Sequence, residues 1–284
     1  MAFKDILIHL DNDTRCETRL VLAIELARRF EAHLTGTYVV DIPPPELFFG
    51  ATPYLGSPPV QVIERMYEDA VAAAAPVEAA FRERLQREAV EGEWRLVDGN
   101  LPATVALHAR YADLTIVGQP NPQEPSDARY HEGALVATVM TSGRPVLAVP
   151  FAGEFPTVGE RVLVAWNASR EAARAVNDAL PLLARAKLVT IFAVNPRLGI
   201  GGHGDVPAAD IALHLARHGV KAEAAHMAAG EIPDSQAVLS SAADIGADLI
   251  VAGAYGHSRA REFIFGGVTR SLLREMTVPV FFSH

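Results

Sequence analysis

Each half of this sequence carries the same short patterns, and this internal repeat constrains the fold more than any other feature. An apolar triplet stands ahead of an Asp or Asn, an Ala-Asp-Leu segment precedes a glycine, and a Pro-Val segment follows. Ile6-Leu7-Ile8, followed by Asp11, matches Val162-Leu163-Val164, followed by Asn167. Ala112-Asp113-Leu114, followed by Gly118, matches Ala247-Asp248-Leu249, followed by Gly253. Pro145-Val146-Leu147 matches Pro279-Val280-Phe281. Such self-similarity predicts one structural unit built twice in tandem.

Within each half, short apolar runs alternate with amphipathic segments of helical length. Because parallel strands need helical crossovers, this α/β alternation predicts two tandem doubly wound five-stranded parallel sheets with helices on both faces. We expect domains at 1–150 and 161–284, joined by a Gly- and Pro-containing linker at 151–160. The predicted strands are 6–10, 33–40, 94–97, 114–117 and 145–150, then 161–166, 188–194, 221–226, 249–252 and 278–282.

Three segments of the first half depart from this simple pattern. Pro76 interrupts the helical segment 60–90, which predicts either two helices or one kinked helix. Residues 119–131 are polar and are predicted to form a loop. The stretch 42–59 is rich in Pro and Gly but carries large apolar side chains. It is either a loop folded onto its own domain or a lid or dimer contact.

Composition argues against several classes of protein. The net charge of −9 is opposite to the basic surface that a nucleic-acid-binding protein needs. Half of the residues are hydrophobic and 21% are charged, so a packed core is expected. Cys16 is the only cysteine, which excludes an intrachain disulfide. We recognise no signal peptide and no apolar stretch near the ~20 residues of a membrane helix, and expect a cytoplasmic protein without a membrane partner.

One segment near the end of the sequence has the pattern of a phosphate site. The apolar run 249–252 predicts a buried strand, and Gly253 ends it. Gly256 follows, and Gly266-Gly267 then open a helical pattern. Glycines let a backbone approach a ligand closely, and a helix start offers unpaired N–H groups at the positive end of its dipole. The segment therefore predicts a site for a nucleotide phosphate.

This spacing, Gly253-x-x-Gly256, nine residues, then Gly266 followed by a small residue, resembles the ATP-binding motif of the universal stress protein family. The tandem units, the strand–loop entry at 166–169 and the closing strand at 278–280 are similar to that family too. The resemblance covers nearly the whole chain. It implies a tandem-domain member with strand order 3-2-1-4-5 in each domain, and a nucleotide across the carboxyl ends of the strands.

The resemblance also implies one ATP site, in the second domain, with or without Mg²⁺. Thr269 sits where a hydroxyl could bond a phosphate oxygen, and Gly253 would lie under the ribose. Expected around adenine and ribose are Ala165, Asn167, Val194 and Gly253, and around the phosphates Gly256, His257, Gly266, Gly267, Val268 and Thr269.

Two residues of this set depart from the family pattern. Gly267 stands where Ser or Thr is usual, which removes a hydroxyl contact. Asn167 stands where Asp is usual, which keeps hydrogen-bonding capacity but removes a charge. Both changes are expected to weaken or shift nucleotide preference without abolishing the site.

The first half departs much further. Gly118 survives, but Asn121 and Glu132 align with the second and third glycines of the motif, and several prolines lie between them. Prolines lack N–H donors and carboxylates repel phosphate. We therefore predict that the first domain has a degenerate phosphate loop and does not bind ATP.

Two other patterns in the sequence resemble ligand sites. The segment 199–204 fits G-x-G-x-x-G, but four residues separate it from the preceding strand, so a loop at the rim of the site is favoured over a dinucleotide turn. His203, Asp205, Asp210 and His214 are candidate metal ligands, but exposed polar side chains are the favoured interpretation, and no metal site is predicted.

No catalytic constellation is recognised, since the chain lacks a G-x-S-x-G elbow, a Cys/His pair and a Walker lysine. We expect a stress-response regulatory protein that binds ATP or a related adenine nucleotide, with at most slow hydrolysis or autophosphorylation. Its domains would form an internal pseudo-dimer that pairs again as a homodimer, and a regulatory partner is expected. The alternatives are an interaction protein with a vestigial site or another small ligand, a slow ATPase, and an enzyme on a related nucleotide-binding scaffold.

Overall fold

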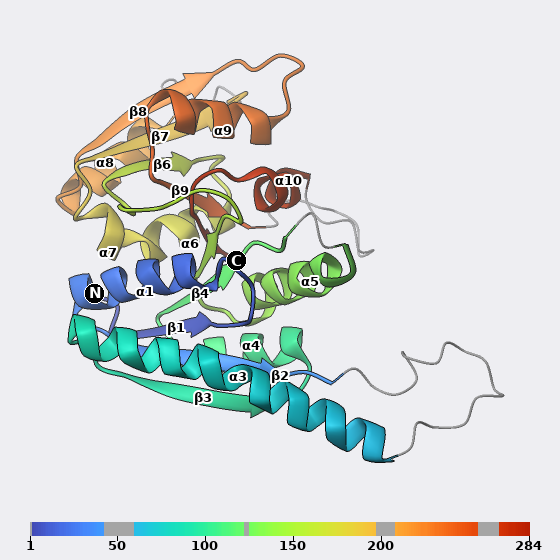
Figure 1. Ribbon diagram of the computed structural model, residues 1–284. Coiled ribbons are helices and arrows are strands. Elements are labelled where there is room, and N and C mark those ends of the chain that lie inside the picture. The colour runs from blue at the N-terminus through green and yellow to red at the C-terminus, as the bar shows by residue number, and fades with distance from the viewer. Residues whose placement is uncertain (1, 43–59, 122–124, 197–207, 255–266) are drawn as a thin grey trace.

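A computed structural model of the chain describes residues 2–42, 60–121, 125–196, 208–254 and 267–284 (Figure 1). Strands and helices alternate along both halves, as predicted. The strands are β1 (Asp5–His9), β2 (His33–Val40), β3 (Gly92–Asp98), β4 (Leu114–Gly118), β5 (Val146–Val149), β6 (Arg161–Ala165), β7 (Leu188–Val194), β8 (Ala222–Met227), β9 (Leu249–Gly253) and β10 (Val280–Ser283). The helices are α1 (Cys16–Phe30), α3 (Val60–Glu88), α4 (Leu101–Ala109), α5 (Pro125–Thr141), α6 (Arg170–Asp178), α7 (Leu180–Leu183), α8 (Ala209–Arg217), α9 (Asp234–Asp244) and α10 (Gly267–Glu275).

The strands form one ten-stranded sheet in the order β3-β2-β1-β4-β5-β10-β9-β6-β7-β8. Each half has the predicted order 3-2-1-4-5, and its strands are parallel. The α/β class and doubly wound topology are therefore confirmed. The two predicted five-stranded sheets are joined into one, because β5 and β10 pair antiparallel along the centre.

The joining of the two sheets buries their last strands. β5 (VLAV) and β10 (VFFS) are short, and every residue in both is buried. An unpaired edge strand would leave its backbone N–H and C=O groups without partners. Pairing Val280 with Ala148 and Phe282 with Val146 satisfies these groups and covers two apolar edges at once.

The repeated Ala-Asp-Leu segment acts as a clamp on the first strand of each half. The Asp113 carboxylate accepts hydrogen bonds from the backbone N–H groups of Lys4 and Asp5, at 2.8 and 3.1 Å. Asp248 accepts in the same way from Gly159 and Arg161, both at 3.0 Å. This shared contact gives a physical reason for the aspartate that the repeat retains.

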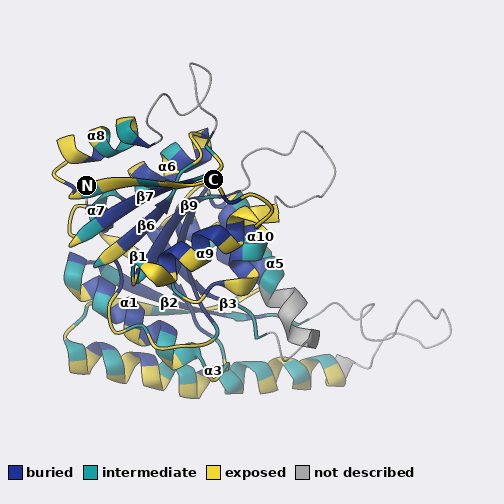
Figure 2. Ribbon diagram, turned by 90° about the horizontal axis from the view of Figure 1, so that it is seen from above, coloured by how far each residue is buried: buried dark blue, intermediate teal, exposed yellow. Residues whose placement is uncertain are grey.

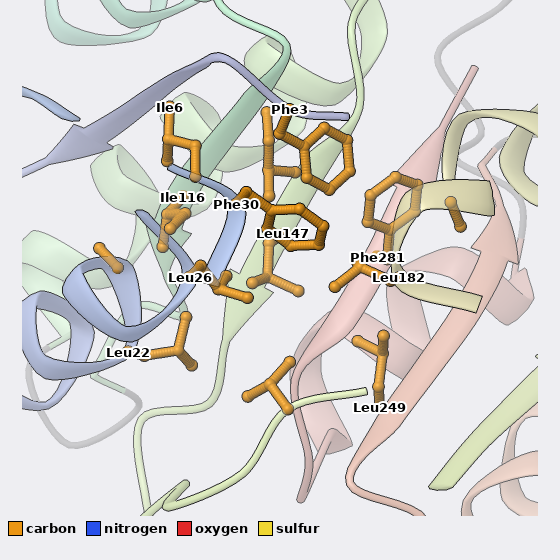
Figure 3. Close-up of a cluster of buried hydrophobic side chains, with 14 of the residues drawn as sticks. Phe3, Ile6, Leu22, Leu26, Phe30, Ile116, Leu147, Leu182, Leu249 and Phe281 are labelled. Carbon is orange, nitrogen blue, oxygen red and sulfur yellow. The ribbon is translucent and has the colours of Figure 1, made fainter. Parts of the chain in front are cut away.

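The core lies on both faces of the sheet and crosses the boundary between the halves. Neighbouring side chains of a strand point to opposite faces, and Phe281 and Phe282 accordingly enter two different clusters. Figure 3 shows Phe281 and Leu182 of the second half facing Phe30 and Leu147 of the first. The central strands are buried, while exposed residues gather on the outer faces of the helices (Figure 2).

Two local predictions for the first half are corrected or resolved. α5 begins at Pro125, so the predicted loop 119–131 is wrong over its second part; proline is well accommodated at the first position of a helix. α3 is one continuous helix through Pro76, which excludes the alternative of two helices. Its first turns extend beyond the sheet (Figure 1).

The predictions for the apolar loop fall on residues 43–59, outside the described residues. Among the helices that the structure describes, none has the length and apolarity to cross a membrane.

Candidate functional site

A cavity of about 250 Å³ lies at the carboxyl ends of three strands in the second half. Strands β6, β7 and β9 form its floor, and helices α9 and α10 begin beside it at Asp234 and Gly267. This is the edge of an open α/β sheet at which ligands bind. The lining residues are Ala165, Trp166, Asn167, Phe192, Val194, Asp234, Val238, Ala252, Gly253, Gly267, Val268, Thr269 and Leu272.

The cavity brings together most of the residues that the sequence nominated. They come from three strand ends and one helix start that are far apart in the chain. Those in the lining are Ala165, Asn167, Val194, Gly253, Gly267, Val268 and Thr269. Gly256, His257 and Gly266 lie outside the described residues, as does the segment 199–204 with its His203 and with Asp205 beyond it.

Gly253 has a role in packing in addition to its place in the cavity. A Cβ added there would stand 2.5 Å from the carbonyl carbon of Glu171 and closer still to the backbone nitrogen of Ala172. These atoms belong to the first turn of α6. Helix α6 can therefore lie directly against the end of β9 only because residue 253 has no side chain.

Asn167 fixes the turn between β6 and α6. Its Oδ1 accepts a hydrogen bond from the N–H of Ser169 at 3.1 Å, and the Ser169 Oγ accepts one from the N–H of Ala172 at 3.1 Å, capping the helix. In the first half, Asp11 accepts from the N–H of Asp13 at 3.0 Å in the equivalent turn. The amide of Asn167 thus has, in the second half, the structural role that the Asp11 carboxylate has in the first.

The start of α10 has the geometry and charge of an anion site. Gly267 is exposed, and a Cβ added to it would meet no atom within 4 Å. Val268 is exposed and Thr269 is buried. The first turn carries no acidic residue. Because the first N–H groups of a helix have no intrahelical partner, this turn can donate hydrogen bonds to a ligand in the cavity.

Sequence reasoning missed the opposite wall of the cavity. Phe192 and Val238 make this wall apolar, and Asp234 adds a carboxylate to it. The Asp234 Oδ1 accepts from the Asn195 Nδ2 at 3.0 Å, and the Asn195 Oδ1 accepts from the N–H of Ala229 at 2.9 Å. The signal that could have found this wall is an aspartate directly after Pro233, which is typical of a helix start.

In the first half, a buried ion pair lies at Asp11 and beside Gly118, the counterparts of Asn167 and Gly253. The Arg19 Nη2 lies 2.5 Å from the Asp11 Oδ1, and the Arg19 residue is only 3% exposed. A Cβ added to Gly118 would overlap the Arg19 guanidinium. The glycine retained at the end of β4 therefore makes room for an arginine, whereas the repeat places Ala175 at the matching position of the second half.

Acid should weaken this ion pair. Burial alone would raise the pKa of Asp11, but Arg19, His9 and the N–H of Asp13 together hold the pKa of this carboxyl below its usual 3.8. A carboxyl whose pKa is lowered by folding stabilises the fold above its unfolded pKa, and this contribution is lost as the pH falls through its folded pKa. We expect the difference in unfolding free energy between the wild type and Asp11→Asn to shrink below about pH 4, measured by urea denaturation. A difference that is the same at pH 7 and pH 3 would contradict this assignment.

The fold and the cavity define a tandem doubly wound α/β protein with a ligand-sized cavity at the carboxyl edge of its second half. Residues 159–284 match the model of the universal stress protein family. This match covers the second half of the chain, and the first half repeats the same topology.

Solved structures extend the comparison over the whole length. A universal stress protein from Archaeoglobus fulgidus DSM 4304 is 17% identical, with a TM-score of 0.72 over 98% of this chain and 96% of that one. A functionally unknown protein from Pseudomonas aeruginosa PAO1 is 14% identical, with a TM-score of 0.60 over 99% of this chain and 92% of that one. At these identities the likeness shows the fold. No curated protein matches the sequence.

Proposed function

We propose that the chain is a stress-response regulatory protein that binds ATP in the cavity of its second half. The observation that carries this proposal is the start of α10, which is open, free of acidic residues in its first turn, and placed over glycine-ended strand β9. The match of the second half to the model of the universal stress protein family supports it.

The two walls of the cavity suggest how the nucleotide lies. β6 stands between β9 and β7 in the sheet, so the cavity runs from the α10 start, across Asn167, to the apolar wall on β7 and α9. We place the phosphates at Gly267 and Thr269, because the start of a helix is the positive end of its dipole and attracts a negative charge. The base would then contact Phe192 and Val194, since aromatic and aliphatic side chains favour a stacked ring.

Placing a carboxylate at the α10 start tests the proposal. Gly267→Asp should reduce ATP affinity by up to about 1,000-fold, because a charge about 4 Å from a phosphate costs about 4 kcal/mol at an effective dielectric constant of 20. The fold should tolerate it, since the site is open and an acidic residue suits a helix start. Isothermal titration calorimetry with ATP, alongside thermal melting, measures both effects.

The repeat supplies a matched control. Gly133 corresponds to Gly267 in the first half, and a Cβ added there would meet only Pro102, at 3.8 Å. Gly133→Asp adds the same charge and should leave ATP affinity unchanged, while Gly267→Ser restores the usual hydroxyl and should preserve or raise it. A wild type that binds no ATP would sink the proposal. Equal losses in both aspartate variants would show that the site is not at α10.

An interaction protein with a vestigial site, or a slow ATPase, is the alternative function. The cytoplasmic location, the homodimer and the regulatory partner stay predictions. The domain bounds 1–150 and 161–284, with a linker at 151–160, are part of the proposal. In their support, β5 ends at Val149 and β6 begins at Arg161.

A further inference from the structure

The carboxyl end of α10 is held by Gln119, a residue of the first half. The Gln119 Nε2 donates to the carbonyl oxygens of Leu273 and Arg274, at 2.9 and 2.8 Å. Its Oε1 accepts from the N–H of Phe151 at 2.9 Å, which fixes the orientation of the amide. The last carbonyl groups of a helix have no intrahelical partner, so Gln119 supplies donors that α10 itself lacks.

A second residue of the first half binds the side of the same helix. Glu132, on α5, lies 3.7 Å from the Arg270 Nε and 3.3 Å from the Arg274 Nη2. Its side chain is 29% exposed. Helices α5 and α10 lie side by side in both views (Figures 1 and 2). Glu132 therefore faces two guanidinium groups that are one helical turn apart.

Both residues stand where the two copies of the repeat differ. Gln119 follows Gly118, and its counterpart in the second half is Ala254. Glu132 aligns with Gly266 of the phosphate motif. The residue that is predicted to make the first half unsuited to phosphate thus also contacts the helix that starts at the cavity of the second half.

We propose that Gln119 and Glu132 are positioning residues for the nucleotide site, which deepens the ATP-binding function proposed above and rests on it. α10 has nine residues and is about 13 Å long, short enough to move as a rigid rod. Fixing its carboxyl end and one side sets the direction of the N–H groups at Gly267 and Thr269. The first half acts on the nucleotide through this helix without touching it.

The test compares ATP with adenosine on the full chain. Gln119→Ala should raise the ATP dissociation constant about three- to tenfold, as expected when two hydrogen bonds that orient the helix are lost. Adenosine has no phosphate to meet α10, so its affinity should not change. Glu132→Gln should act in the same direction but more weakly, since exposed ion pairs contribute little. Calorimetry measures the affinities, and hydrogen exchange should show faster exchange of the α10 amides in Gln119→Ala.

Arg185→Ala is the matched control. The Arg185 Nη1 donates to the carbonyl oxygen of Arg29, another contact between the halves that does not involve α10. This variant should bind ATP as the wild type does. The inference is overturned if Gln119→Ala keeps full ATP affinity, or if its affinity for adenosine falls as much as its affinity for ATP. It is also overturned if Arg185→Ala lowers ATP affinity to the same extent. A wild type that binds no ATP overturns the proposed function as well, and unchanged α10 exchange in Gln119→Ala overturns the positioning role independently.

Discussion

Arg19→Met is expected to lower the free energy of unfolding by about 3–5 kcal/mol, because it leaves the Asp11 carboxylate without its ionic partner in a largely buried place. The Asp11 and Arg19 side chains are 19% and 4% exposed, so water cannot fully replace the lost guanidinium. Urea denaturation followed by circular dichroism measures the loss. Methionine fills much of the volume that arginine occupied, so the effect reports mainly on the charge.

A double variant separates the buried charge from the lost volume. Asp11→Asn together with Arg19→Met removes both charges, and asparagine can still accept from the N–H of Asp13, as Asn167 does from Ser169 in the second half. It should recover most of the stability that Arg19→Met loses, because replacing a whole buried pair by neutral groups is often nearly neutral. Equal stability of the two variants would show that the unpaired carboxylate is not the cause.

Gly253→Ala is the second change with a large expected effect. The new methyl group would overlap backbone atoms of Glu171 and Ala172, which cannot rotate away as a side chain can. α6 would have to move off β9, at a cost typical of overpacking, about 1–3 kcal/mol or more. Because α6 also carries the turn at Asn167, we expect ATP binding to fall together with the melting temperature.

Gly267→Ala is the matched control for that steric argument. It adds the same methyl group to a glycine of the same cavity, but in open space. Its melting temperature should equal that of the wild type. If Gly253→Ala melts as Gly267→Ala does, the close approach of α6 to β9 is not a constraint on the sequence.

The repeat predicted much of this architecture, since its patterns have local physical causes. Asp113 and Asp248 clamp the first strands, and the glycines at 118 and 253 lie at strand ends where another group comes close. Apolar runs such as 114–117 marked strands that are buried on both faces. Seven of the nominated site residues line one cavity because the carboxyl ends of parallel strands meet at one edge.

What the sequence could not predict depends on contacts between distant residues. Nothing in the short strands β5 and β10 announces that they pair with each other rather than with a second chain. The Arg19 side chain fills the space beside Gly118, and this depends on the conformation of the arginine, which the spacing of residues along the sequence does not reveal. Similarly, Asp234 and Phe192 belong to the cavity only because α9 begins beside β7.

Because the antiparallel seam between β5 and β10 lies within one chain, its formation does not depend on protein concentration. Two separate copies would meet only at a rate set by their concentration, whereas a covalent chain holds its own partner at an effective concentration of the order of millimolar. The seam therefore forms at any dilution. Because this pairing does not depend on a ligand, residues such as Arg19 and Glu132 can differ between the two halves without loss of the contact between them.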